Sequence, residues 1–108
     1  MDIRYSEAVR QWPEGFELLQ QATRRLEEVV GPADAPNLSG EWDRTGAPGE
    51  QSQFTLRVRN PDGEVRGELD LLELQNPHFR SIRMRDVWGQ LLNLRIHRLL
   101  ANLQEGDE

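Results

Sequence analysis

The sequence predicts an α+β domain in which two helices pack on one face of a three-stranded antiparallel β-meander. Three observations carry this prediction. Apolar residues recur at alternating steps of three and four over residues 9–30, which indicates an amphipathic helix. Two runs of alternating apolar and polar residues flank residues 60–63, which indicates a hairpin. A second helical apolar stripe covers residues 88–103. The order helix, sheet, helix fits one small domain over residues 1–108.

The first helix is predicted over residues 13–30, after a short N-terminal arm over residues 1–12. Proline is tolerated in the first turn of a helix, so Pro13 marks the start, and Gly31 with Pro32 marks the end. We interpret its apolar stripe as a face packed in the chain's own core, the alternative being that it also pairs with a second copy. The stripe consists of Val9, Trp12, Phe16, Leu19, Thr23, Leu26 and Val30.

Residues 31–52 are rich in glycine and proline, which predicts a flexible loop region. Within it, weak alternation predicts a short edge strand over residues 40–45, with Trp42 as its inward anchor. Residues 45–52 are expected to be mobile. Whether residues 31–52 become ordered on binding is left open by the sequence.

The alternating runs 54–59 and 64–71 are predicted to form the hairpin. Side chains directly opposite one another share a face of the sheet, so apolar residues must oppose apolar residues. Pairing Arg59 with Glu64 meets this condition along both strands. A bulged turn that pairs Asn60 with Glu64 would set Val58 against a charged side chain, and we therefore predict the first register.

The last third predicts a helix from about residue 78. Phe79 and Ile82 lie off its apolar stripe, so we expect the first turns to be oriented differently or the helix to bend near Gly89. The alternative is a fourth short strand over residues 79–85, with Ile82 and Met84 pointing inward. The stripe consists of Trp88, Leu91, Leu92, Ile96, Leu99, Leu100 and Leu103.

The predicted core draws on all of these segments, because a sheet buries its one apolar face under the helices. Its residues are Trp12, Phe16, Leu19, Trp42, Phe54, Leu56, Val58, Leu69, Leu71, Trp88, Leu92, Ile96 and Leu99.

Composition excludes several kinds of chemistry. The chain has no Cys, which excludes disulfides, zinc–thiolate sites, Fe–S clusters and thiol nucleophiles. All 13 cations are Arg, and the absence of Lys excludes Schiff bases and lysine-dependent phosphate loops. The sequence contains neither a membrane-length apolar run nor an N-terminal secretory signal. We therefore expect a cytoplasmic protein of bacterial type without membrane contact.

Few residues are candidates for catalysis. His78 and His97 have no ligand-like companions, and we interpret them as exposed helix residues. Glu68 and Asp70 share a strand face at roughly 7 Å, but nearby arginines explain them better as part of a surface charge lattice. We therefore predict no catalytic residue, no metal site and no cofactor, and we do not expect an enzyme.

The charge is distributed unevenly along the chain. Residues 1–50 hold five Arg and ten acidic residues, whereas residues 77–98 hold five Arg and one Asp. The candidate interaction surface consists of Arg80, Arg83, Arg85, Arg57, Arg59 and Trp12.

We expect a non-catalytic protein-interaction or structural module that binds a protein partner or a second copy of itself. The first alternative is nucleic-acid binding through arginine, which the net charge of −6 disfavours. The second alternative is a small-ligand binder or an enzyme with an unrecognised site.

Overall fold

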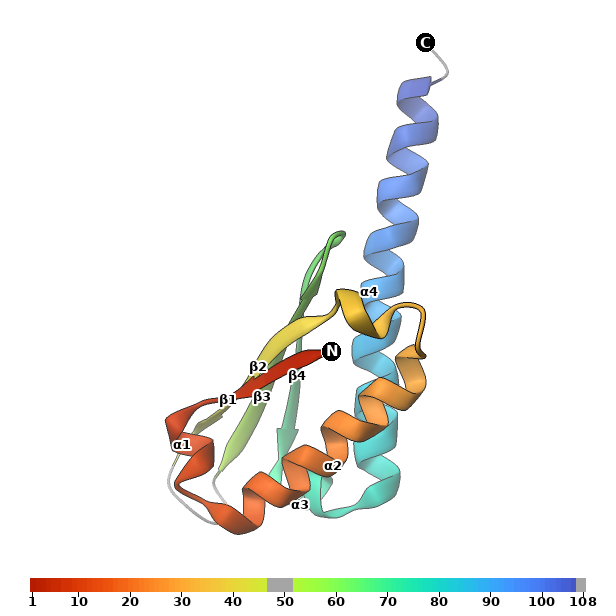
Figure 1. The fold of residues 1–108 in the computed structure, drawn as a ribbon. Coiled ribbons are helices and arrows are strands. Elements are labelled where there is room, and N and C mark those ends of the chain that lie inside the picture. The colour runs from red at the N-terminus through yellow and green to blue at the C-terminus, as the bar shows by residue number, and fades with distance from the viewer. Residues whose placement is uncertain (47–51, 107–108) are drawn as a thin grey trace.

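The computed structural model describes residues 1–46 and 52–106, the last three of them by their backbone. Within these residues one four-stranded sheet has the order β1-β2-β3-β4. The α+β class is confirmed (Figure 1). The strands are β1 (Asp2–Tyr5), β2 (Ser39–Thr45), β3 (Gln53–Asn60) and β4 (Gly63–Asp70). The helices are α1 (Glu7–Arg10), α2 (Pro13–Val30), the short 3₁₀ helix η1 (Ala35–Asn37), α3 (Leu71–Gln75) and α4 (Pro77–Gly106).

The predicted antiparallel meander is present as β2, β3 and β4, but the sheet is not three-stranded, because β1 adds a fourth, parallel strand. Tyr5 of β1 lies opposite Trp42 of β2, and α1 and α2 form the crossover that a parallel pair requires. The predicted N-terminal arm, residues 1–12, is therefore mostly strand and helix. Because β1 covers its edge, β2 is an inner strand and not the predicted edge strand.

In the described part of the predicted loop region, residues 31–46 and 52, more than half of the residues belong to regular structure. It contains η1 and β2, and Trp42 is fully buried, as predicted. Residues 47–51, where we expected mobility, lie outside the described residues. Ser52 at the end of this region is buried.

The β3–β4 hairpin has the predicted register, with Arg59 opposite Glu64. The side chain of Asn60 accepts a hydrogen bond of 2.9 Å from the backbone N–H of Asp62, which holds the turn. The second strand ends at Asp70, one residue earlier than predicted, because Asp70 caps α3. Its carboxylate accepts from the N–H of Glu73, and the Glu73 carboxylate accepts from the N–H of Asp70.

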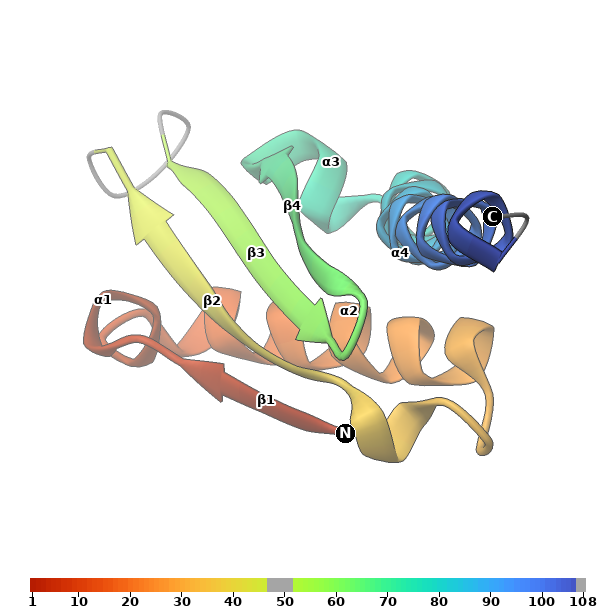
Figure 2. The same cartoon turned by 90° about the horizontal axis from the view of Figure 1, so that it is seen from above.

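Both long helices pack on the same face of the sheet (Figure 2). Most of the predicted α2 stripe lies in the core, and β3 alternates buried and exposed residues as a half-covered strand should. The buried residues are Val9, Leu19, Ala22, Leu26, Val30, Ala35, Leu38, Trp42, Phe54, Leu56, Val58, Leu69, Leu74, Met84, Val87 and Leu91.

Thr23, the one polar residue of the α2 stripe, joins α2 to two strands. Its Oγ1 accepts a hydrogen bond of 2.9 Å from Nε1 of Trp42 and one of 3.0 Å from the hydroxyl of Tyr5. The Thr23 hydroxyl donates in turn to the Leu19 carbonyl at 2.8 Å. One hydroxyl thus satisfies two aromatic polar groups, which are costly to bury without a partner.

The last third of the chain is one continuous helix, so the alternative of a strand over residues 79–85 is wrong. Ile96 and Leu99, both predicted as core, are 52% and 49% exposed. The reason is length, because thirty helical residues span roughly 45 Å whereas an eight-residue strand spans roughly 27 Å. The second half of α4 therefore extends beyond the sheet (Figure 1).

The first half of α4 lies very close to β4. A Cβ built on Gly67 would come within 2.6 Å of Cγ2 of Val87. Only a glycine at this position lets the helix approach the strand this closely. At Gly89, by contrast, an added Cβ meets nothing within 4 Å.

We expect Thr23→Val to lower the free energy of unfolding by about 2–3 kcal/mol, because it removes the acceptor of two partly buried donors. Urea unfolding followed by tryptophan fluorescence measures this change. Thr55→Val, on the open face of β3, is the matched control and should change stability by less than about 0.5 kcal/mol. Equal losses in the two variants would contradict the role given to Thr23.

We expect Gly67→Ala to destabilise the protein by about 1–3 kcal/mol, because the added methyl group collides with Val87. Gly89→Ala adds the same methyl group in open space within a helix and should stabilise by up to about 1 kcal/mol. Thermal unfolding followed by circular dichroism should show melting temperatures that move in opposite directions. Shifts of the same sign would refute this close approach.

Candidate interaction surfaces

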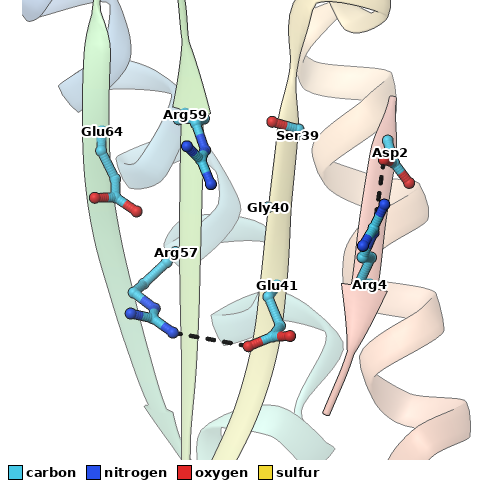
Figure 3. A pocket seen from close by; sticks show the side chains of 8 residues that line it. All are labelled: Asp2, Arg4, Ser39, Gly40, Glu41, Arg57, Arg59 and Glu64. Atoms are coloured by element: carbon cyan, nitrogen blue, oxygen red, sulfur yellow. Dashed lines mark ion pairs between the residues drawn. The ribbon is translucent and has the colours of Figure 1, made fainter.

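The open face of the sheet carries two of the predicted interaction residues, Arg57 and Arg59. They alternate with the buried Leu56 and Val58, so they point away from α2 and α4. They border a shallow hollow of about 420 Å³ on this face (Figure 3). The lining residues are Asp2, Arg4, Ser39, Gly40, Glu41, Arg57, Arg59 and Glu64.

The charges around this hollow balance one another, with three arginines and three acidic residues. Arg57 Nη2 lies 3.7 Å from Glu41 Oε1, and Arg4 Nε lies 3.8 Å from Asp2 Oδ2. All four side chains are well exposed, and such ion pairs contribute less than about 1 kcal/mol each. The hollow is therefore a solvated charge lattice without the excess positive charge that attracts phosphate.

Two of the three predicted α4 arginines hold the helix to its neighbours. Arg80 donates to the carbonyl of Leu74 at 2.9 Å and to the side chain of Gln21 at 3.0 Å. Arg83 Nη2 lies 2.8 Å from Glu73 Oε2, and the hydrogen bond to Glu73 is the main cause that raises the pKa of Arg83. Arg80 and Arg83 thus tie α4 to α2 and α3.

The third α4 arginine, Arg85, is exposed. Arg57 and Arg59 point to the open face of the sheet, and Arg83 lines a hollow with Arg66, which lies opposite Arg57 on that face. Arg80 lines another hollow with Arg24 and Arg25 of α2.

Trp12, the remaining predicted interaction residue, is half-buried and packs at the end of the sheet. Its ring stacks on Phe54 with centroids 5.3 Å apart, and the guanidinium of Arg44 lies 5.9 Å from the ring. A Cβ on Gly15 would overlap the indole of Trp12, so the helix backbone itself packs against the ring. Trp12 is thus largely occupied by packing within the chain.

The residues considered for catalysis are dispersed in the structure. His78 and His97 are both exposed on α4, and Asp70 is occupied in capping α3. In the described part of the chain, no three His, Asp or Glu side chains are grouped as metal ligands would be. No described helix combines the length and apolarity needed to cross a membrane.

The second half of α4 exposes an apolar surface that includes Ile96 and Leu99, two residues predicted to lie in the core. Ile96 is 52% exposed, Leu99 49%, Leu100 52% and Leu103 66%. We call it the α4 patch, and it consists of Ile96, Leu99, Leu100 and Leu103.

The periodicity of α4 contained a signal for this patch. The buried residues Met84, Val87 and Leu91 define one side of the helix, and the patch lies on the other side at 100° per residue. The helix thus carries apolar residues on two sides, of which the sheet covers one.

A cluster of charges fixes the base of the projecting half of α4. Arg95 Nη2 lies 3.0 Å from Asp34 Oδ1, and its Nε lies 3.5 Å from Asp62 Oδ2. Arg98 Nε forms an ion pair of 2.8 Å with Asp62 Oδ1, a buried oxygen that accepts no hydrogen bond within the described residues. The hydrogen bond to Asp34 is the main cause that raises the pKa of Arg95.

Only 5% of the Asp62 side chain is exposed, so this carboxylate lies at the protected centre of the cluster. Leu94 packs beside the cluster against the hairpin turn, because a Cβ on Gly63 would come within 3.0 Å of its Cδ1. The cluster and Leu94 together attach the helix to the β3–β4 turn where the patch begins.

Comparisons with protein-family models, with curated proteins and with solved structures found no match to this chain.

We expect Asp62→Asn to accelerate amide hydrogen exchange over residues 92–103 by several-fold, because it weakens the attachment of α4 to the β3–β4 turn. Exchange at residues 80–90 should be unchanged. Asp86→Asn is the control, since Asp86 is exposed and lies 3.9 Å from Arg83. Unaltered exchange over residues 92–103 in Asp62→Asn would show that the cluster does not restrain the helix.

Proposed function

We propose that the protein is a non-catalytic protein-interaction module that binds an apolar partner helix through the α4 patch. The observation that carries this proposal is the exposure of four aliphatic side chains on one side of a helix that stands clear of the sheet (Figure 1). Grouped apolar surface of this kind is unfavourable in water and marks sites of association. An apolar helix face is matched by another such face or by a groove.

The attachment of α4 supports this role. A binding element that is already ordered loses little conformational entropy when its partner arrives. The Asp34 and Asp62 carboxylates hold Arg95 and Arg98 at the base of the projecting half. The patch is therefore presented on a preorganised helix.

The polar surfaces give less support to the other functions considered. In the sheet hollow, arginines and carboxylates of opposite sign lie near one another in solvent, and nothing focuses them on a substrate. Nucleic-acid binding is disfavoured, because the net charge is −6 and the arginines around the sheet hollow are matched by as many carboxylates. A binding role through apolar contact fits the described surface better than either alternative.

Site-specific photo-cross-linking in cells that produce the protein tests this proposal. A photoreactive benzophenone side chain is placed at Leu100, in the patch, or at Ala101, which is exposed on another side of the same helix. We expect a protein adduct from position 100 at a yield at least about tenfold above that from position 101, since only the patch is in contact.

The adduct from position 100 should also disappear when Ile96→Glu is added to the same chain. No adduct at either position, or equal yields at both, would exclude the patch as the binding surface.

A further inference from the structure

We infer that the partner helix is α4 of a second copy of this chain, so that two α4 patches pair in a homodimer. This inference rests on the proposed function of the patch and identifies its partner. It follows from the spacing of the apolar residues, from the charges beside them, and from the geometry of the projecting helix.

The spacing is that of a short coiled coil. Leu92, Ile96, Leu99 and Leu103 follow one another at steps of four, three and four. In heptad notation Ile96 occupies an a position, and Leu92 and Leu99 occupy d positions. A β-branched residue at a with leucine at d is the combination that favours two paired helices. A second copy supplies the same knobs and holes, so the patch is complementary to itself.

The charges beside the patch also fit a second copy. Between residues 92 and 103 the charged residues are Arg95 and Arg98; Arg95 reaches back to Asp34 and Asp62, and Arg98 reaches back to Asp62. Asn93 and Asn102 provide uncharged neighbours on the helix. Two copies therefore bring no unpaired like charges together along the contact, and a strongly charged partner would find no complement.

The fold leaves room for the second helix. The sheet packs on the side of α4 that carries Met84, Val87 and Leu91, so the patch faces away from it. The molecule measures 56 × 26 × 23 Å, and the long dimension is extended by the projecting half of α4 (Figure 1). The open space at Gly89 shows that this outer side stays accessible below the patch.

The size of the contact predicts its strength. Residues 92–103 span roughly 18 Å, slightly less than two heptads. Such a contact is smaller than the roughly 800 Å² per partner of a standard interface, so we expect a dissociation constant in the micromolar range. Each copy carries a net charge of −6, and the two bodies repel each other at low salt. Added salt should therefore strengthen the dimer, whereas it weakens a contact held by opposite charges.

Sedimentation velocity from about 1 µM to about 300 µM protein tests the inference across the expected range of dissociation constants. We expect monomer at the low end, dimer at the high end, and a tighter dimer at about 500 mM than at about 50 mM NaCl. Leu99→Glu should raise the dissociation constant at least about 100-fold, because it places two carboxylates in the apolar contact. Ala101→Glu is the matched control, with the same added charge at the outward f position, and should stay within about threefold of the wild type.

Circular dichroism melts at about 1 µM separate loss of pairing from loss of fold, and both variants should melt like the wild-type monomer, since both positions are exposed. A monomer at about 300 µM, or equal dimerisation of Leu99→Glu and Ala101→Glu, would overturn self-pairing. If the photo-adduct from position 100 then has a mass other than twice that of the chain, the proposed function stands and the partner is a different protein. The absence of both dimer and adduct would overturn both proposals.

Discussion

The fold depends on the hydroxyl group of Thr23. Trp42 and Tyr5 come from neighbouring strands and carry their polar groups into the layer between sheet and helix, where each needs an acceptor. Thr23 Oγ1 serves both, at 2.9 and 3.0 Å. These hydrogen bonds connect α2 to β1 and β2, which are paired with each other by their own parallel ladder. Once α2 is placed, Leu19 and Leu26 cover the face that β2 and β3 present, and the remaining space beside β4 is left for α4.

The position of α4 has a direct consequence for function. Gly67 allows the helix to lie against β4, and Arg95 and Arg98 attach it to Asp62 at the hairpin turn. Beyond that point the sheet has ended, and the helix continues without a layer to pack on (Figure 1). The apolar residues of its second half are therefore exposed by geometry, although their composition resembles that of a core. A second helix is the simplest structure that can cover them.

The charged hollow on the open face of the sheet and the apolar α4 patch differ in what they offer a partner. On the open face of the sheet, Arg57 and Glu41 already lie 3.7 Å apart in water, so a charged ligand must compete with an existing neighbour and with solvent. The α4 patch has no such compensation, and its burial against another apolar surface releases water from four side chains. The net charge of −6 then acts against self-association at long range, which makes the proposed dimer weak and sensitive to salt.

Local patterns in the sequence determined the helix over residues 13–30, the hairpin register at Arg59 and Glu64, and the buried position of Trp42, because each depends on periodicity or on a short turn. The tertiary structure decided the rest. In β1 only Ile3 and Tyr5 alternate as apolar strand residues do, and its pairing partner β2 follows α2 in the sequence. The apolar stripe of α4 shows that the helix is amphipathic, but burial of Ile96 and Leu99 depends on where the sheet ends. That boundary is set by strand pairing between distant segments, which no local pattern encodes. The periodicity of α4 marks a second apolar side, but the exposure of that side follows only from the relative lengths of sheet and helix in space.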